Sequence, residues 1–322
     1  MVEQKRARPL DLVGPPFYAT VLGTAGLGIA WRIASTLIGV PGFVGELFVL
    51  LAFVLFTLVS LLLIARIFLQ SNFLSDLWID NRAILFVPMI PTSMLLLSIG
   101  ARPYDIGFAT LLWTLAAPIN LLVALVITGR WLFQEHGIRD VSPAWMFPVV
   151  GNGVVPIAGV PLGFANASWA FFSFGFVLWI ISFAVLFACL VLGDNVVRSA
   201  RPTLLVLISP PATFFIAYSE LTGARIDPFA YGMIYFSLFL LGVFLLNGKW
   251  VFHAPYSIAS WSLTFPMAAL TIATLLFFQA TGWSAAHWAS VALLGMTTLF
   301  VASVLVLASA ATIRNLYSFA FT

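Results

Sequence analysis

The sequence predicts an all-α integral membrane protein of ten transmembrane helices, and three observations support this fold class. Of the 322 residues, 62% are hydrophobic and 8% are charged, whereas a soluble domain carries about 25% charged residues. The mean hydropathy is +1.10. The chain also contains ten apolar stretches near the length of about 20 residues that a helix needs to cross a bilayer. This composition excludes a soluble enzyme, a nucleic-acid-binding domain and a disordered chain.

The ten predicted spans follow one another with short connections. We expect them at residues 15–39, 43–70, 83–99, 106–133, 144–165, 168–192, 203–222, 227–247, 258–280 and 284–311. The first is interpreted as a retained span because its long apolar run has no small-residue cleavage site. The third is the shortest, the fifth is rich in Gly and Pro, and the sixth combines many aromatic residues with no charge. Because no connection has room for a further domain and no Walker A motif occurs, residues 1–322 are expected to form a single transmembrane domain that is not driven by ATP.

Lysine and arginine residues give the predicted orientation. If the N-terminus is inside, eleven of them fall on the inner side: Lys5, Arg6, Arg8, Arg66, Arg82, Arg130, Arg139, Arg198, Arg201, Lys249 and Arg314. Only Arg102 and Arg225 fall in outer loops, and Arg32 lies within the first span. Basic residues are enriched in cytoplasmic loops, so we expect both termini in the cytoplasm and the chain in a bacterial-type inner (plasma) membrane.

Prolines divide the spans into two kinds. Consecutive spans pair into five hairpins, 15–70, 83–133, 144–192, 203–247 and 258–311. The first members contain Pro15, Pro16, Pro88, Pro91, Pro148, Pro156, Pro161, Pro210, Pro211 and Pro266, whereas only Pro118 lies in the interior of a second member. A proline frees a backbone carbonyl, which a membrane tolerates inside the protein or beside water. The pattern predicts five inner helices around a pore and five outer helices that face lipid; the alternative is that the prolines only kink packed helices.

The inner spans carry no charge in their middles, so the predicted pore is neutral. Its polar groups would be hydroxyls, one amide and freed backbone, and the candidates are Thr20, Thr24, Thr92, Ser93, Asn152, Ser209, Thr213, Ser262 and Thr264. Each could instead bond a carbonyl of its own helix. Hydroxyl donors would hold an anion weakly, as conduction requires, and the deep carboxylates of a cation filter are missing. The three His residues have no partner at metal-ligand spacing, so neither a metal nor a cofactor is expected.

Basic residues near the ends of the inner spans point to anions as well. Five of them shortly precede an inner span and could attract anions to the cytoplasmic mouth: Arg8, Arg82, Arg139, Arg201 and Lys249. The positive-inside bias alone would also put them there. Arg32, near the outer end of the first span, is a candidate outer anion site if it points inward.

Three stretches of the chain are distinctive: FYATVLGTAGLGIAW at residues 17–31, SPAWMFPVVGN at 142–152, and the segment running from RPTLLVLISPPATFFIAY at 201–218 to WSLTFPMAA at 261–269. In this order and spacing they resemble the tellurite-resistance/dicarboxylate transporter family, which includes bacterial TehA and the slow-type anion channels of plants. The resemblance covers essentially the whole chain. It implies five hairpins with pseudo-fivefold symmetry around a pore, a homotrimer with one pore per subunit, and a phenylalanine from the ninth helix that plugs the pore. That position matches Phe265, and Pro266 would kink the gate helix.

We therefore expect a passive channel for small anions such as chloride or nitrate, gated by Phe265. Its expected partners are small inorganic or organic anions, membrane lipid and two further copies of the chain. The alternative within transport is a secondary transporter that exports sulfite or moves C4-dicarboxylates or tellurite. A remote alternative is an intramembrane enzyme, which would need paired ionisable residues at membrane depth that the sequence does not offer.

Overall fold

The computed structural model describes residues 13–192, 198–251 and 258–320, and this part of the chain consists of helices and connections without a strand. The α-helices are α1 (Ala19–Ile38), α2 (Gly42–Leu69), α3 (Phe73–Ile79), α4 (Met89–Ala101), α5 (Ile106–Phe133), α6 (Met146–Gly159), α7 (Ala165–Leu192), α8 (Ser209–Thr222), α9 (Pro228–Leu246), α10 (Gly248–Val251), α11 (Thr264–Thr281) and α12 (Ser284–Ala320). Short 3-10 helices lie between them: η2 (Pro15–Tyr18), η3 (Ala83–Phe86), η4 (Ile138–Asp140), η5 (Pro143–Trp145), η6 (Val160–Leu162), η7 (Arg198–Ile208) and η8 (Ile258–Leu263).

The ten predicted spans are confirmed within the described residues. Ten helical segments are long and apolar enough to cross a membrane, and each overlaps one predicted span. The differences lie at the ends: the last helix continues to Ala320, beyond the predicted end at 311, and the connection after α2 contains the short helix α3. The chain is thus a multi-pass, all-α membrane protein.

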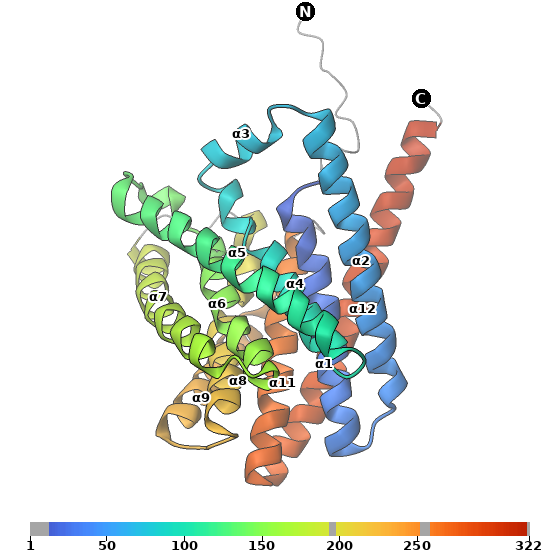
Figure 1. The fold of residues 1–322 in the computed structure, drawn as a ribbon, viewed down its shortest axis with the longest axis vertical. Helices are drawn as coiled ribbons and strands as arrows, with labels where there is room; N and C mark the ends of the chain where they lie inside the picture. The colour runs from blue at the N-terminus through green and yellow to red at the C-terminus, as the bar shows by residue number, and fades with distance from the viewer. Residues whose placement is uncertain (1–12, 193–197, 252–257, 321–322) are drawn as a thin grey trace, which may run out of the picture.

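The spans form two layers, as the prolines predicted. In the first members of the hairpins, 61–78% of the most apolar window is buried, against 22–33% in the second members. Each first member packs on its own hairpin partner: α1 on α2, α4 on α5, α6 on α7, α8 on α9 and α11 on α12. The first members also pack in sequence on one another, α1 on α4, α4 on α6, α6 on α8, α8 on α11, and α11 back on α1. Figure 1 shows α2 and α12 on one side of this ring, and α7 and α9 on another. The predicted pseudo-fivefold symmetry of the ring stays a prediction.

Each inner span begins as a 3-10 helix and continues as an α-helix. The α-helices begin at Ala19, Met89, Met146, Ser209 and Thr264, directly after the 3-10 helix in four spans and after two intervening residues in the span of α4. Most prolines of the inner spans lie at or beside this change, where a missing N–H interrupts few α-helical hydrogen bonds. Pro266, for example, is the third residue of α11, directly after η8. In the span that carries Phe265, Pro266 thus lies in the first turn of α11, next to this change of helix type.

Glycines on α1 let its neighbours approach closely. A Cβ added at Gly23 would lie 2.5 Å from Cβ of Thr264 on α11, and one added at Gly26 would lie 2.9 Å from Cβ of Ala268. On the opposite side, a Cβ at Gly28 would lie 2.9 Å from the backbone nitrogen of Val49 on α2. These glycines are packing residues, as small residues commonly are between membrane helices.

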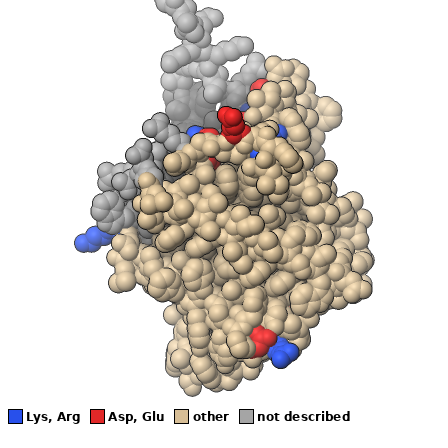
Figure 2. Space-filling view, turned by 90° about the vertical axis from the view of Figure 1, so that its left-hand side faces the viewer, with Lys and Arg blue, Asp and Glu red and all other residues tan. Residues whose placement is uncertain are grey.

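The surface agrees with a membrane location. On the face drawn in Figure 2, most charged side chains lie near the two ends, one basic side chain projects from the left edge, and the rest of the face is uncharged. Large apolar side chains of the outer helices are exposed, for instance Phe43, Leu47 and Leu50 along α2. Lipid rather than water suits such a surface.

Candidate functional site

Two cavities lie inside the ring, and all five inner spans line both of them. The wide cavity has a volume of about 300 Å³ and is lined by Ile29, Arg32, Ile33, Thr36, Leu96, Ile99, Arg102, Pro103, Val154, Ile157, Thr213, Ile216, Glu220, Phe265, Ala269, Ile272, Leu276 and Gln279. The narrow cavity has a volume of about 20 Å³ and is lined by Ala19, Leu22, Met89, Thr92, Phe147, Val150, Val206, Ser209, Trp261, Phe265 and Pro266. The narrow cavity lies where the α-helices of the inner spans begin, and the wide cavity lies toward their ends.

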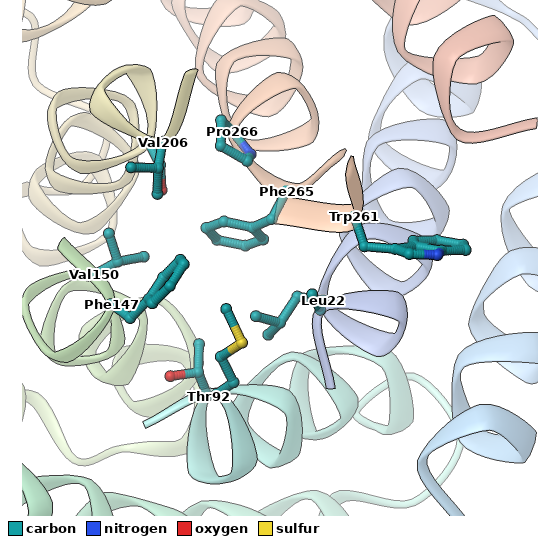
Figure 3. Close-up of a pocket in the computed structure, with 11 residues that line it drawn as sticks. Leu22, Thr92, Phe147, Val150, Val206, Trp261, Phe265 and Pro266 are labelled. Carbon is teal, nitrogen blue, oxygen red and sulfur yellow. The ribbon is translucent and has the colours of Figure 1, made fainter. Parts of the chain in front are cut away.

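Phe265 borders both cavities. It is the only described residue that lines both of them, and only 9% of its surface is exposed. Figure 3 shows its ring pointing from α11 into the space between Leu22, Phe147 and Val206. The aromatic ring therefore lies at a point where it contacts the lining of both cavities.

Most of the candidate pore hydroxyls bond their own helix. Thr92 lines the narrow cavity, but its hydroxyl donates to the carbonyl oxygen of Pro88 at 2.7 Å. Thr20, Thr24, Ser93 and Thr264 are buried, donate to carbonyls three or four residues earlier, and line neither cavity. The side chain of Ser262 lies outside the described residues.

Ser209 and Thr213 are different. Ser209 lines the narrow cavity and Thr213 the wide one. Both side chains are completely buried, and neither hydroxyl has a hydrogen-bond partner.

Asn152 turns away from the cavities. Its Oδ1 accepts a hydrogen bond from Nδ2 of Asn120 on α5 at 2.7 Å, and its own Nδ2 donates to the carbonyl oxygen of Pro148 at 2.9 Å. A Cβ added at Gly175 on α7 would lie 2.7 Å from Cβ of Asn152. The amide thus ties α6 to the outer helices instead of lining the path.

Arg32 lines the wide cavity but is already paired. Its Nε donates to Oε1 of Glu46 at 2.8 Å and its Nη2 to Oε2 at 2.6 Å, while Nη1 donates to the carbonyl oxygen of Gly100 at 2.6 Å. The hydroxyl of Tyr104 also donates to Glu46, and this hydrogen bond is the main reason why the pKa of Tyr104 is raised. Two further charged side chains line the cavity, Arg102 and Glu220.

The five basic residues of the predicted cytoplasmic mouth are only partly described. Arg8 lies outside the described residues, as do the side chains of Arg139 and Arg201. Arg82 and Lys249 are exposed, and neither lines a cavity. Nη2 of Arg82 lies 3.3 Å from Oδ1 of Asp140. The pKa of Asp140 is lowered, first by the backbone N–H of Gly137 and then by Arg82.

Sequence reasoning missed several features of the site. Glu46 follows Arg32 across the first hairpin turn, and opposite charges on either side of a turn are a signal that could have paired them. Arg102 and Glu220 are visible in the sequence near the ends of two inner spans, but their sharing of one cavity depends on the ring. The described residues contain no cluster of three His, Cys, Asp or Glu side chains suited to a metal ion.

Comparison with known protein families gives one match over nearly the whole chain. A family model described as SLAC1, voltage-dependent anion channel, matches residues 13–309.

Individual relatives are more distant. The chain is 28% identical to the S-type anion channel SLAH2 of Arabidopsis thaliana over 229 residues, 68% of this chain and 42% of that protein. It is 23% identical to the guard cell S-type anion channel SLAC1 of the same plant over 171 residues, 52% of this chain and 31% of that protein. It is 21% identical to the tellurite resistance protein TehA homolog of Haemophilus influenzae over 270 residues, 82% of this chain and 80% of that protein. The matched regions thus span about half or less of the plant proteins.

Proposed function

The chain belongs to the SLAC1 voltage-dependent anion channel family, and on that premise we propose that it is a passive channel for small anions such as chloride and nitrate, closed by the ring of Phe265. The observation that carries the proposal is that Phe265 alone, among the described residues, borders both cavities of the helix ring. An apolar ring excludes water from the passage, and a rotamer change or a shift of α11 opens it.

The lining favours anions over cations. The narrow cavity has no charged side chain among its lining residues. Around it lie the first turns of α1, α4, α6, α8 and α11, and an α-helix carries a partial positive charge at its N-terminal end. A cation filter would need carboxylates or converging carbonyls at this level.

Charges in the wide cavity are nearly balanced. Arg32 is neutralised by Glu46, which leaves Arg102 and Glu220 as the remaining charged lining residues. A site that grips a dianion would need an excess of unpaired cations. This balance favours conduction of monovalent anions over tight binding of a dicarboxylate.

The orientation, the membrane and the assembly are part of the proposal. We place the chain in an inner (plasma) membrane with both termini on the cytoplasmic side, so that the narrow cavity faces the cytoplasm and the wide cavity faces outward. Three copies of the chain assemble, and each copy contains one pore. The chain then acts without chemical catalysis. The alternating distribution of basic residues supports the orientation.

A secondary transporter is the second candidate. One observation favours it: the wide cavity is closed by Phe265 at one end, as an occluded carrier site would be. The name of the Haemophilus influenzae relative, a tellurite resistance protein, fits either mechanism.

The test is anion flux from proteoliposomes containing the parent or Phe265→Ala. Holding an ion in a dry apolar constriction costs several kcal/mol, and each 1.4 kcal/mol is a factor of about ten, so we expect a rise in chloride and nitrate flux of about 100-fold. The matched control is Phe277→Ala, because Phe277 is also buried on the same helix and packs on Phe215 and Trp283 but lines neither cavity.

Two results count against the proposal. Equal flux in Phe265→Ala and Phe277→Ala removes the gate. Saturable, proton-coupled uptake without net current in the parent replaces the channel by the transporter.

A further inference from the structure

The two unpartnered hydroxyls of α8 are exceptions among the hydroxyls that line the cavities. Thr92 donates to Pro88 and Thr36 donates to the carbonyl oxygen of Ile33 at 2.8 Å. Ser209 and Thr213 have no partner although both are completely buried. A buried hydroxyl without a partner costs about 1–3 kcal/mol, and such groups in a native protein call for an explanation.

The two hydroxyls lie on the same face of α8, on either side of the Phe265 level. Residues four apart in an α-helix lie one above the other, about 6 Å apart along the axis. Ser209 shares the lining of the narrow cavity with Phe265, and Thr213 shares the lining of the wide cavity with it. Helix α8 packs directly against α11. The pair therefore brackets the passage that the ring closes.

Packing fixes one of these side chains. A Cβ added at Gly153 on α6 would lie 2.9 Å from Cγ2 of Thr213, so the methyl group lies against α6. The hydroxyl on the same Cβ cannot exchange places with the methyl group without losing this contact. The methyl group of Thr213 therefore packs closely on the backbone of Gly153.

We propose that the hydroxyls of Ser209 and Thr213 form a paired anion site that passes a small, partly dehydrated monovalent anion across the level of Phe265. The inference rests on the proposed function and names the groups that replace water around the ion. Each hydroxyl donates one hydrogen bond, and no charged residue lines the narrow cavity, so the pair suits a halide or nitrate rather than a dianion. A site with one neutral donor at each step binds weakly, which lets the ion leave as readily as it enters.

The test removes each hydroxyl in the open background. Ser209→Ala and Thr213→Val, each combined with Phe265→Ala, are recorded in planar bilayers with chloride and nitrate. The loss of one hydrogen bond to an anion predicts a single-channel conductance about five- to tenfold lower for each variant, and Thr213→Ser restores it. The controls are Ser237→Ala and Thr274→Val, whose buried hydroxyls donate to Met233 and Leu270 and line neither cavity.

A second readout excludes a merely structural role. Because neither hydroxyl is paired in the closed protein, replacing it by an apolar group should leave the melting temperature of the parent unchanged or higher. Crystals of the parent soaked in bromide should show anomalous scattering beside Ser209 and Thr213.

The outcomes separate the two proposals. If Phe265→Ala conducts anions but the hydroxyl variants match their controls, the paired site is wrong and the channel stands. If Phe265→Ala carries no anion current while bromide binds at the two hydroxyls, the gate is wrong and the anion site stands. Lower melting temperatures of both hydroxyl variants, or no bromide at this level, overturn the paired site.

Discussion

Gly23→Ala tests whether close packing of α1 on α11 positions the gate. The added Cβ would lie 2.5 Å from Cβ of Thr264, the residue before Phe265. Carbon atoms in ordinary contact are about 3.5–4.0 Å apart, so the two helices must separate by about 1 Å at the level of the ring. The separation should let Phe265 move and admit anions to the passage.

The loss of stability expected for Gly23→Ala follows from two opposing contributions. Overpacking costs about 1–3 kcal/mol, while alanine regains about 0.5–1 kcal/mol over glycine in a helix interior. The net loss of about 1–2 kcal/mol corresponds to a fall in melting temperature of about 2–8 °C for a chain of this order of size. Thermal denaturation in detergent measures it, and proteoliposome flux measures the accompanying chloride leak.

Gly129→Ala is the matched control, because no atom lies within 4 Å of a Cβ added there on α5. It should melt at or slightly above the temperature of the parent and conduct no more than the parent. If Gly23→Ala has the same melting temperature and flux as Gly129→Ala, the contact does not position the gate.

Three further predictions concern the charged groups outside the gate. Glu46→Gln weakens the hydrogen bonds of Arg32 and leaves the charge of Arg32 unbalanced. Removing one member of a buried ion pair costs up to about 3–5 kcal/mol, and because 44% of the Glu46 side chain is exposed, the expected loss of stability is well below that. Thermal denaturation measures this loss, and adding Arg32→Met should partly reverse it. Glu220→Gln removes a negative charge from the wide cavity. When it is combined with Phe265→Ala, the chloride conductance should rise about two- to fivefold at neutral pH, and the rise should be smaller at high salt. An unchanged single-channel conductance contradicts this prediction. Asp227 caps α9, and the hydrogen bond from the Tyr218 hydroxyl is the main cause of the lowered pKa of Asp227. The stability that the Asp227 carboxylate contributes is therefore complete above the ordinary Asp pKa of about 3.9 and is lost as pH falls through the lowered pKa. Over this acidic range, the melting temperature of Asp227→Asn should depend less on pH than that of the parent.

The layered fold was predictable because one simple rule governs it. Hydropathy located ten spans, and prolines separated the inner from the outer ones, since only buried helices tolerate freed backbone carbonyls. The 3-10 beginnings of the inner spans were not predictable, because an apolar run such as residues 203–208 has the same composition in either helix type. The sequence predicted five inner helices around a pore, but which inner helix contacts which depends on packing.

The site was predictable by residue type but not by role. Nine polar residues were expected to line the path, but the sequence does not indicate which of their hydroxyls donate a hydrogen bond to a carbonyl of their own helix. Thr92 and Thr213 illustrate this: both line a cavity, yet only the hydroxyl of Thr92 makes a hydrogen bond, to the carbonyl oxygen of Pro88. Arg32 was a candidate outer anion site if it pointed inward, and its pairing with Glu46 became evident only in the folded hairpin.

The central claim is that Phe265 closes an anion path, and the most direct test is the reversal potential of Phe265→Ala in a planar bilayer. Under a tenfold gradient of potassium chloride, an anion-selective pore reverses near the chloride equilibrium potential, about 59 mV from zero. We predict a large current reversing close to that value, with the parent nearly silent. Reversal at the potassium potential, or a current no larger than that of the parent, contradicts the account.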